Sequence, residues 1–181
     1  MRVLVPFANG LEELEAVTII DVLRRGGLEV TSVALGTELQ IHGSRGITLL
    51  ADATWDSLDP TDFDAIVLPG GGKGTETLCA DERVIQAVQA FAQESKIVAA
   101  LCAAPTVLAL AGVLDDRKAT CYPSCAPQLG RAYDDAPVIA DGHIITSQGP
   151  GTAMLFSLVL IQHLVGEETA HQVAKSLITS F

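Results

Sequence analysis

Short apolar segments that alternate with helical segments constrain the fold of this 181-residue chain more than any other feature. RVLVPF at 2–7, AIVLP at 65–69 and IVAAL at 97–101 are continuous apolar runs, without the polar residue at every second position that a half-exposed strand shows. Such runs are typical of strands in a parallel sheet that helices cover on both faces. We therefore predict an α/β fold of the flavodoxin-like or Rossmann-like type, with a doubly wound, mainly parallel sheet.

The predicted elements alternate along nearly the whole chain. Glycines, prolines and polar clusters separate them, and no internal repeat or long linker interrupts the series. We therefore expect a single domain that spans 1–181. The predicted helices cover 11–25, 84–93, 105–111, 151–165 and 167–177. The predicted strands cover 2–7, 28–35, 64–72 with its glycine loop, 96–101, 118–121, 138–139 and 143–146. A predicted hairpin covers 40–50.

Charge and hydropathy exclude several classes of function. A net charge of -11 repels the phosphate backbone, so we expect no nucleic-acid binding. The first apolar run is too short for a signal peptide, and the run at 154–160 is shorter than the ~20 residues of a membrane span. We expect a cytoplasmic protein without membrane association. Its four cysteines are then free thiols, metal ligands or catalytic groups rather than a disulfide scaffold.

Cys102 occupies the most informative position. It directly follows the apolar run at 97–101 and precedes two alanines, Pro105 and a predicted helix. Small neighbours permit the sharp, strained strand-to-helix turn of a nucleophile elbow. A helix N-terminus beneath the sulfur favours the thiolate, so we expect a lowered thiol pKa. The alternative is a small buried hydrophobic side chain, which is what most free cysteines are.

Glu15 is the predicted partner of Cys102. Helical spacing places it on one face with Leu11, Leu14, Thr18 and Val22, while Glu12 and Glu13 point elsewhere. A carboxyl group on a face that packs against the core is desolvated, which raises its pKa and suits it to proton transfer. The alternative is a side chain that reaches solvent near the helix start, where acidic residues are favoured.

Two further motifs lack a strong signature. In PGGGKGTE at 69–76, glycine follows the lysine, whereas a phosphate loop requires serine or threonine there. The segment is therefore either a nest of N–H donors for an oxyanion or a plain turn. CYPSC at 121–125 has neither the spacing nor the accompanying ligands of a zinc site, and the histidines are scattered. We expect no bound metal and a structural role for Cys79.

Several segments together resemble the ThiJ/PfpI family, most closely its branch of deglycases, glutathione-independent glyoxalases and a bacterial chaperone. They are NGLEELEAVTIIDVLRRGG, GSRGITLLAD, FDAIVLPGGGKG, IVAALCAAPTVLA and ITSQGPGTA, in family order over nearly the whole chain. The resemblance implies a flavodoxin-like fold, a homodimer and an oxidation-sensitive nucleophilic cysteine. Cys102 matches that cysteine, and Glu15 matches the glutamate that hydrogen-bonds it.

The resemblance also implies roles for other residues. It assigns pocket amides to Gly70, Gly71 and Ala103, a position near the dimer contact to Arg45, and an arginine pair to Arg24 and Arg25. Tyr122 takes the position where many members carry histidine, and the adjacent Cys121 then becomes a second thiol near the pocket. Tyrosine hydrogen-bonds but is a poor base at neutral pH. Alanine after the nucleophile replaces the histidine of peptidase-type relatives, so we do not expect proteolysis.

Three functional hypotheses follow, and none requires a cofactor. In the first, the Cys102 thiolate attacks methylglyoxal, glyoxal or early glycation adducts, Glu15 moves the proton, and N–H groups of Gly71 and Ala103 hold the oxyanion. In the second, oxidation of Cys102 makes the protein a stress sensor or a redox-regulated chaperone for unfolded clients. In the third, the chain is an interaction module that does not depend on its cysteine.

Overall fold

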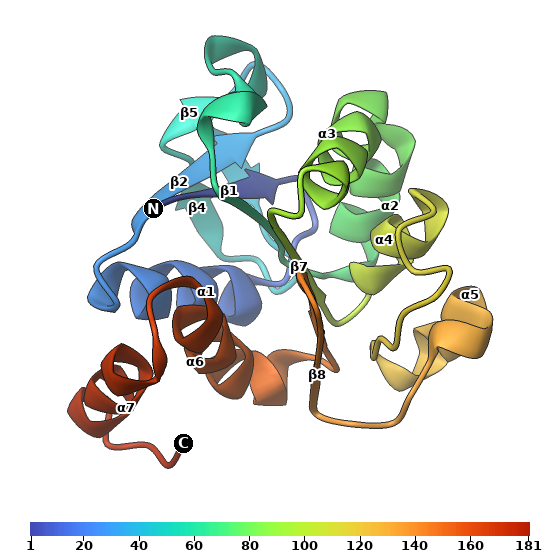
Figure 1. Cartoon of the computed structure of the whole chain (residues 1–181). Coiled ribbons are helices and arrows are strands. Elements are labelled where there is room, and N and C mark those ends of the chain that lie inside the picture. The colour runs from blue at the N-terminus through green and yellow to red at the C-terminus, as the bar shows by residue number, and fades with distance from the viewer.

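A mixed seven-stranded sheet forms the centre of the computed structural model, which describes residues 1–181 (Figure 1). Its order is β5-β2-β1-β6-β7-β9-β8, and every neighbouring pair is parallel except β9 with β8. These strands are β1 (Arg2–Phe7), β2 (Glu29–Ala34), β5 (Ala53–Thr54), β6 (Ala65–Leu68), β7 (Ile97–Leu101), β8 (Val138–Asp141) and β9 (Ile144–Ser147). The predicted mainly parallel sheet is therefore confirmed.

Helices cover both faces of this sheet (Figure 1). On one face α1 packs against α6, and α7 packs against α6 in turn; α2, α3 and α4 lie on the other face, with α5 beside α4. None of the helices combines the length and apolar character needed to cross a membrane. Their bounds are α1 (Glu13–Arg25), α2 (Gly72–Ala80), α3 (Glu82–Gln93), α4 (Pro105–Leu110), α5 (Ala126–Leu129), α6 (Ala153–Leu164) and α7 (Glu167–Ser176).

The two-faced cover explains the apolar runs. Along β1, Val3 and Val5 belong to the hydrophobic core under α1 and α6, whereas Leu4 belongs to the core under α3 and α4. All three side chains are fully buried. Because successive residues of a strand point to opposite faces, a strand between two helical layers requires apolar side chains at every position.

The β3–β4 hairpin lies outside the main sheet. β3 (Gln40–His42) pairs antiparallel with β4 (Thr48–Leu50), as predicted for 40–50. Its tip is attached to α1 through Glu13, whose carboxylate accepts hydrogen bonds from the backbone N–H groups of Arg45 at 2.7 Å and Ile47 at 3.2 Å. The hairpin therefore extends over the start of α1.

Two predicted features of the fold are wrong. The predicted strand at 118–121 forms only an isolated bridge between Ala119 and Tyr133, because β9 already pairs with β7 on one side and β8 on the other. The glycine loop at 70–74 continues directly into α2, a helix that the sequence did not predict, since glycines lower helix propensity. Tertiary packing decides this case: a Cβ atom at Gly74 would lie 2.8 Å from the backbone nitrogen of Leu11.

Candidate functional site

Cys102 lies on a strained turn at the carboxyl end of β7. Its φ angle is 63°, in the left-handed region that non-glycine residues rarely adopt. Two backbone hydrogen bonds hold it there: its N–H donates to Ser147 at 2.9 Å, and its carbonyl accepts from the N–H of Tyr122 at 2.7 Å. The sharp turn predicted between strand and helix is therefore present, and it is held from both sides.

Glu15 is fully buried beside this turn. Its Oε2 atom accepts a hydrogen bond from the backbone N–H of Gly70 at 2.8 Å, while its Oε1 atom has no hydrogen-bond partner. The buried face of α1 carries Glu15 together with Ile19 and Val22, but Leu14, predicted on this face, is 54% exposed. The partial desolvation expected for Glu15 is confirmed, although the predicted helical face was partly wrong.

Burial and mutual contact shift both ionisable groups. Burial raises the pKa of Glu15 to about 7, although its interactions with the Cys102 thiol and the Gly70 amide act in the opposite direction. Burial and, to a smaller extent, the negative charge of Glu15 together raise the pKa of Cys102 to about 12. Near neutral pH the thiol therefore keeps its proton, and Glu15 is the group of the pair that titrates.

The prediction of a lowered Cys102 pKa was wrong. Backbone N–H groups of Gly71 and Ala103 do hydrogen-bond the sulfur and lower its pKa, but desolvation and the Glu15 carboxylate outweigh them. The helix that follows, α4, is only six residues long, so its dipole is small. The Cys102 thiol consequently ionises more readily when Glu15 is protonated and neutral than when it is a carboxylate.

The glycine loop encloses the pair. A Cβ atom at Gly70 would lie 2.7 Å from the Cβ atom of Cys102 and 2.8 Å from Oε2 of Glu15, so no side chain fits between them. Gly71 adopts a φ angle of 97° and ends its loop at the start of α2. Of the two readings of this motif, the structure favours the nest of N–H donors, because the Gly71 amide faces the sulfur.

Tyr122 lies on the more open side of the sulfur. A Cβ atom at Gly149 would be 3.4 Å from the Tyr122 ring and 4.0 Å from the Cys102 sulfur, so these three groups are neighbours. Tyr122 is 48% exposed, so this neighbour of the sulfur is in contact with solvent. Gly149 was not predicted as a site residue; its position just after β9, at the same sheet edge as Cys102, is the signal that identifies it.

Cys121 and Arg45 make no described side-chain contact with Cys102 or Glu15, although Cys121 directly precedes Tyr122, whose N–H donates to the Cys102 carbonyl. Cys121 is fully buried in the hydrophobic core under α4, where burial and the nearby Cys125 raise its pKa to about 12. Arg45 is exposed on the β3–β4 hairpin, and only its backbone N–H has a described contact, to Glu13. Arg24 and Arg25, the predicted arginine pair, form exposed ion pairs with Asp52 and Asp21.

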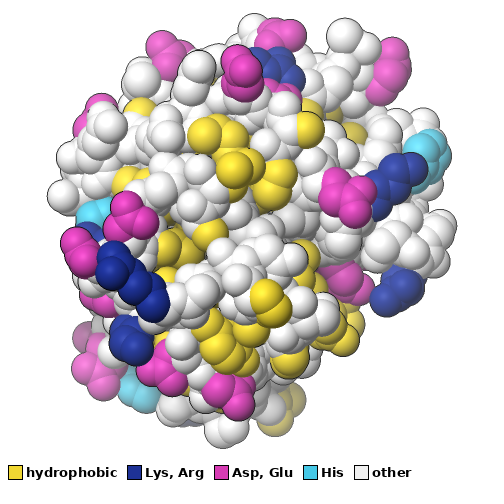
Figure 2. All heavy atoms as spheres, turned by 90° about the vertical axis from the view of Figure 1, so that its right-hand side faces the viewer, with side chains coloured by type: hydrophobic (Ala, Val, Ile, Leu, Met, Phe, Trp, Pro, Cys, Tyr) yellow, Lys and Arg dark blue, Asp and Glu magenta, His cyan; other side chains and the backbone are white.

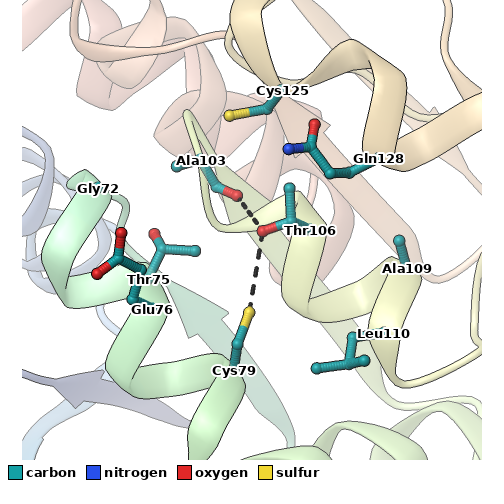
Figure 3. Close-up of a pocket in the computed structure, with 10 residues that line it drawn as sticks. All are labelled: Gly72, Thr75, Glu76, Cys79, Ala103, Thr106, Ala109, Leu110, Cys125 and Gln128. Atoms are coloured by element: carbon teal, nitrogen blue, oxygen red, sulfur yellow. Dashed lines mark hydrogen bonds between the residues drawn. The ribbon is translucent and has the colours of Figure 1, made fainter.

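Sequence reasoning missed a cavity of about 690 Å³ between α2 and α4 (Figure 3). Its wall includes Ala103 and two cysteines, Cys79 and Cys125, which were not assigned to a site. It also missed Glu13, which is buried and holds the β3–β4 hairpin although it was expected to point elsewhere. No group of three or more histidine, cysteine, aspartate or glutamate side chains is arranged to hold a metal ion.

Comparisons with known proteins agree with the overall fold. The model of the DJ-1/PfpI family matches residues 1–163. Protein dj-1beta of Drosophila melanogaster is 39% identical over 98% of this chain and 97% of its own length. The glutathione-independent glyoxalase DJ-1 of Schizosaccharomyces pombe is 32% identical over 94% of each chain. The structure of oxidized Toxoplasma gondii DJ-1 superposes with a TM-score of 0.96 at 34% identity, covering 99% of both chains.

Some relatives are longer than this chain. Against two homologues from Arabidopsis thaliana, the chain spans 41% and 46% of their length. Whatever those longer proteins do as a whole, the comparison with this chain concerns only the matched part.

Proposed function

Because this chain belongs to the DJ-1/PfpI family, we propose that it is a glutathione-independent glyoxalase that converts 2-oxoaldehydes such as methylglyoxal into 2-hydroxy acids. The observation that carries the proposal is the buried contact between the Cys102 thiol and a carboxyl group, Glu15, whose pKa is about 7. A general acid–base group works best when its pKa lies near the working pH. The name of the fission yeast relative supports the same activity.

The first step is addition of the thiol to the aldehyde. The Cys102 sulfur forms a bond to the aldehyde carbon while Glu15, as carboxylate, accepts the thiol proton and passes it to the carbonyl oxygen. The product is a hemithioacetal. Backbone N–H groups of Gly71 and Ala103, which face the sulfur, are placed to stabilise the negative charge that develops on that oxygen.

The second step moves a proton between carbons. Glu15, again as carboxylate, removes the proton from the former aldehyde carbon and delivers it to the adjacent carbonyl carbon. The hydroxyl proton of the hemithioacetal moves to the oxygen of that carbonyl, which leaves a 2-hydroxy thioester on Cys102. Water then hydrolyses the thioester, releasing lactate from methylglyoxal and restoring the thiol. Addition of one water balances the reaction, and it needs neither an oxidant nor a metal. The same chemistry on early glycation adducts would appear as deglycation.

The test follows methylglyoxal loss and lactate formation with purified protein. Cys102→Ser removes the nucleophile and Glu15→Gln removes the proton carrier without changing the size of the side chain, so we expect both to abolish lactate formation. Glu168→Gln, an exposed change on α7, is the matched control and should retain the wild-type rate. Equal rates for wild type and Cys102→Ser would refute the proposal.

A second candidate function is oxidation sensing at the same cysteine. Its support is the Oε1 atom of Glu15, which is buried without a hydrogen-bond partner on the side chain that contacts the Cys102 thiol. Two equivalents of hydrogen peroxide convert the thiol into a sulfinic acid and release two waters, and a protonated Glu15 can then donate to a sulfinate oxygen. Mass spectrometry after mild peroxide treatment tests this. Oxidation of Cys102 no faster than that of Cys79 would contradict it.

We also propose that the protein forms a homodimer through α1 and the β3–β4 hairpin. Leu14 and Val17 on α1 are 54% and 49% exposed, and Ile47 and Leu50 on the hairpin are 56% and 72% exposed. Val17 and Leu50 line one hollow, so α1 and the hairpin contribute to the same surface. Sedimentation should show a dimer that Leu50→Lys converts to a monomer, whereas Ile178→Lys, at a site 95% exposed, leaves it unchanged.

A further inference from the structure

The cavity between α2 and α4 has no role in the chemistry described above. It measures about 690 Å³, within the range of small-molecule sites. Figure 3 shows Cys79 on the α2 side, Thr106 and Leu110 on the α4 side, and Gln128 above them. Figure 2 views this side of the molecule, where hydrophobic side chains gather near the middle and charged side chains lie mainly toward the rim.

The cavity begins at the segments that hold the reactive sulfur. Ala103 and Gly72 line it. Ala103 also donates its backbone N–H to the Cys102 sulfur, and Gly72 directly follows Gly71, the second donor. A substituent that extends past Ala103 and Gly72 from an aldehyde carbon bound at the sulfur would enter this opening.

The wall suits a neutral, largely apolar group. Ala109 and Leu110 contribute aliphatic surface, and the one charged side chain that lines the cavity is the exposed carboxylate of Glu76, which would repel an anionic group. Burial raises the pKa of Cys79, which therefore contributes a neutral thiol at physiological pH. Its sulfur lies 4.0 Å from the Thr106 hydroxyl, which donates to the Ala103 carbonyl at 2.8 Å.

A polar group on the same wall lacks a partner. Thr75 is 5% exposed, it lines the cavity, and its hydroxyl oxygen has no hydrogen bond within the protein. The oxygen itself is buried below the surface of the wall, so Thr75 offers its methyl group rather than a polar atom to the cavity (Figure 3). Methylglyoxal carries only a methyl substituent and would leave most of this space unfilled.

We propose that the cavity is the subsite for an aryl or long alkyl substituent of the 2-oxoaldehyde, so that phenylglyoxal is used more efficiently than methylglyoxal. The turnover preference rests on the proposed glyoxalase function. Binding of a neutral aromatic ketone to the cavity does not depend on that function. Acetophenone is a suitable probe because it lacks the aldehyde group. The two claims can therefore be tested separately.

The binding experiment uses Cys102→Ser protein, amide NMR shifts and acetophenone. We expect shifts concentrated at Thr75, Thr106 and Gln128. Ala109→Phe, which fills the cavity from α4, should weaken binding at least about tenfold, the effect of losing an apolar contact of this size. Leu110→Ala, at a side chain 61% exposed and so harmless to folding, should weaken it by a smaller factor.

The kinetic experiment compares kcat/KM for phenylglyoxal and methylglyoxal in wild type and Ala109→Phe. We expect a loss of about tenfold for phenylglyoxal and less than about twofold for methylglyoxal. If Ala109→Phe abolishes acetophenone binding but wild type turns over neither aldehyde, the subsite is supported and the glyoxalase proposal fails. Equal acetophenone affinity in Ala109→Phe and its parent, or equal losses for both aldehydes, would overturn the subsite.

Discussion

Replacing Glu15 by glutamine should remove a pH dependence from the stability of this protein. The pKa of Glu15 rises from 4.5 to about 7 in the folded state, with burial as the largest cause. The folded protein therefore holds a proton on Glu15 over a range in which the unfolded chain has released it. Stability that is fully present below about pH 4.5 is lost as the pH rises through about 7.

The size of the effect follows from the shift. One pKa unit corresponds to about 1.4 kcal/mol, so the free energy of unfolding should fall by roughly 3 kcal/mol across this range because of Glu15 alone. Other groups titrate there too, so the quantity to compare is the difference between wild type and Glu15→Gln. Glutamine keeps an oxygen that can accept from the Gly70 N–H but carries no ionisable proton.

The assay is urea unfolding followed by circular dichroism at several pH values, with constant ionic strength and one protein concentration. Wild type should lose roughly 3 kcal/mol relative to Glu15→Gln between about pH 4.5 and 7.5, and Glu168→Gln should follow the wild-type curve. A difference between wild type and Glu15→Gln that stays flat over this range would show that Glu15 does not take up its proton there. The assignment of Glu15 as the titrating partner of Cys102 would then be wrong.

Three further predictions concern the same region. At pH 8.5, Glu15→Gln should speed alkylation of Cys102 by iodoacetamide several-fold, since loss of the carboxylate lowers the thiol pKa; an unchanged rate would mean that its charge does not reach the sulfur. Gly70→Ala should destabilise the fold by roughly 2–4 kcal/mol in denaturant unfolding, because its Cβ atom overlaps Cys102, whereas Gly72→Ala meets no atom within 4 Å and should be neutral or slightly stabilising. Equal stabilities of these two variants would contradict the packing argument. Glu13→Gln should accelerate hydrogen exchange of the hairpin amides that Glu13 holds, by a factor equivalent to about 1–3 kcal/mol. Burial raises the pKa of Glu13 but its hydrogen bonds lower it overall, so protonation of Glu13 in acid should accelerate the same exchange in wild type. Exchange rates that change neither with the substitution nor with acid would refute this role of Glu13.

Much of the fold was predictable because a strand between two helical layers needs apolar side chains on both faces. RVLVPF, AIVLP and IVAAL meet this requirement, and each forms a strand of the central sheet. The pair of glycines after Arg25 ends α1 as predicted, with Gly27 at a φ angle of 79°. The apolar runs and the glycine pair are local signals, because the chemistry of neighbouring residues determines where these strands form and where α1 ends.

The elements that were missed depend on contacts between distant segments. α2 starts inside a run of glycines because that backbone packs against Gly10 and Leu11. The segment 118–121 could not join the sheet, since β8 occupies the only free side of β9. Neither fact is visible in local propensity, because each depends on what another part of the chain already occupies.

The candidate site divides in the same way. The position of Cys102 after a buried strand and the helical spacing of Glu15 are properties of the sequence, and they predicted that these two side chains meet, although Leu14 of the same predicted face is exposed. The sequence did not determine the thiol pKa, the burial of Glu13 and Cys121, or the cavity beside Ala103. Desolvation, the distance between two charges and the volume left between helices exist only once segments far apart in the chain are packed together. Tertiary structure therefore decided which group of the pair carries the proton, whereas the sequence determined which two groups share it.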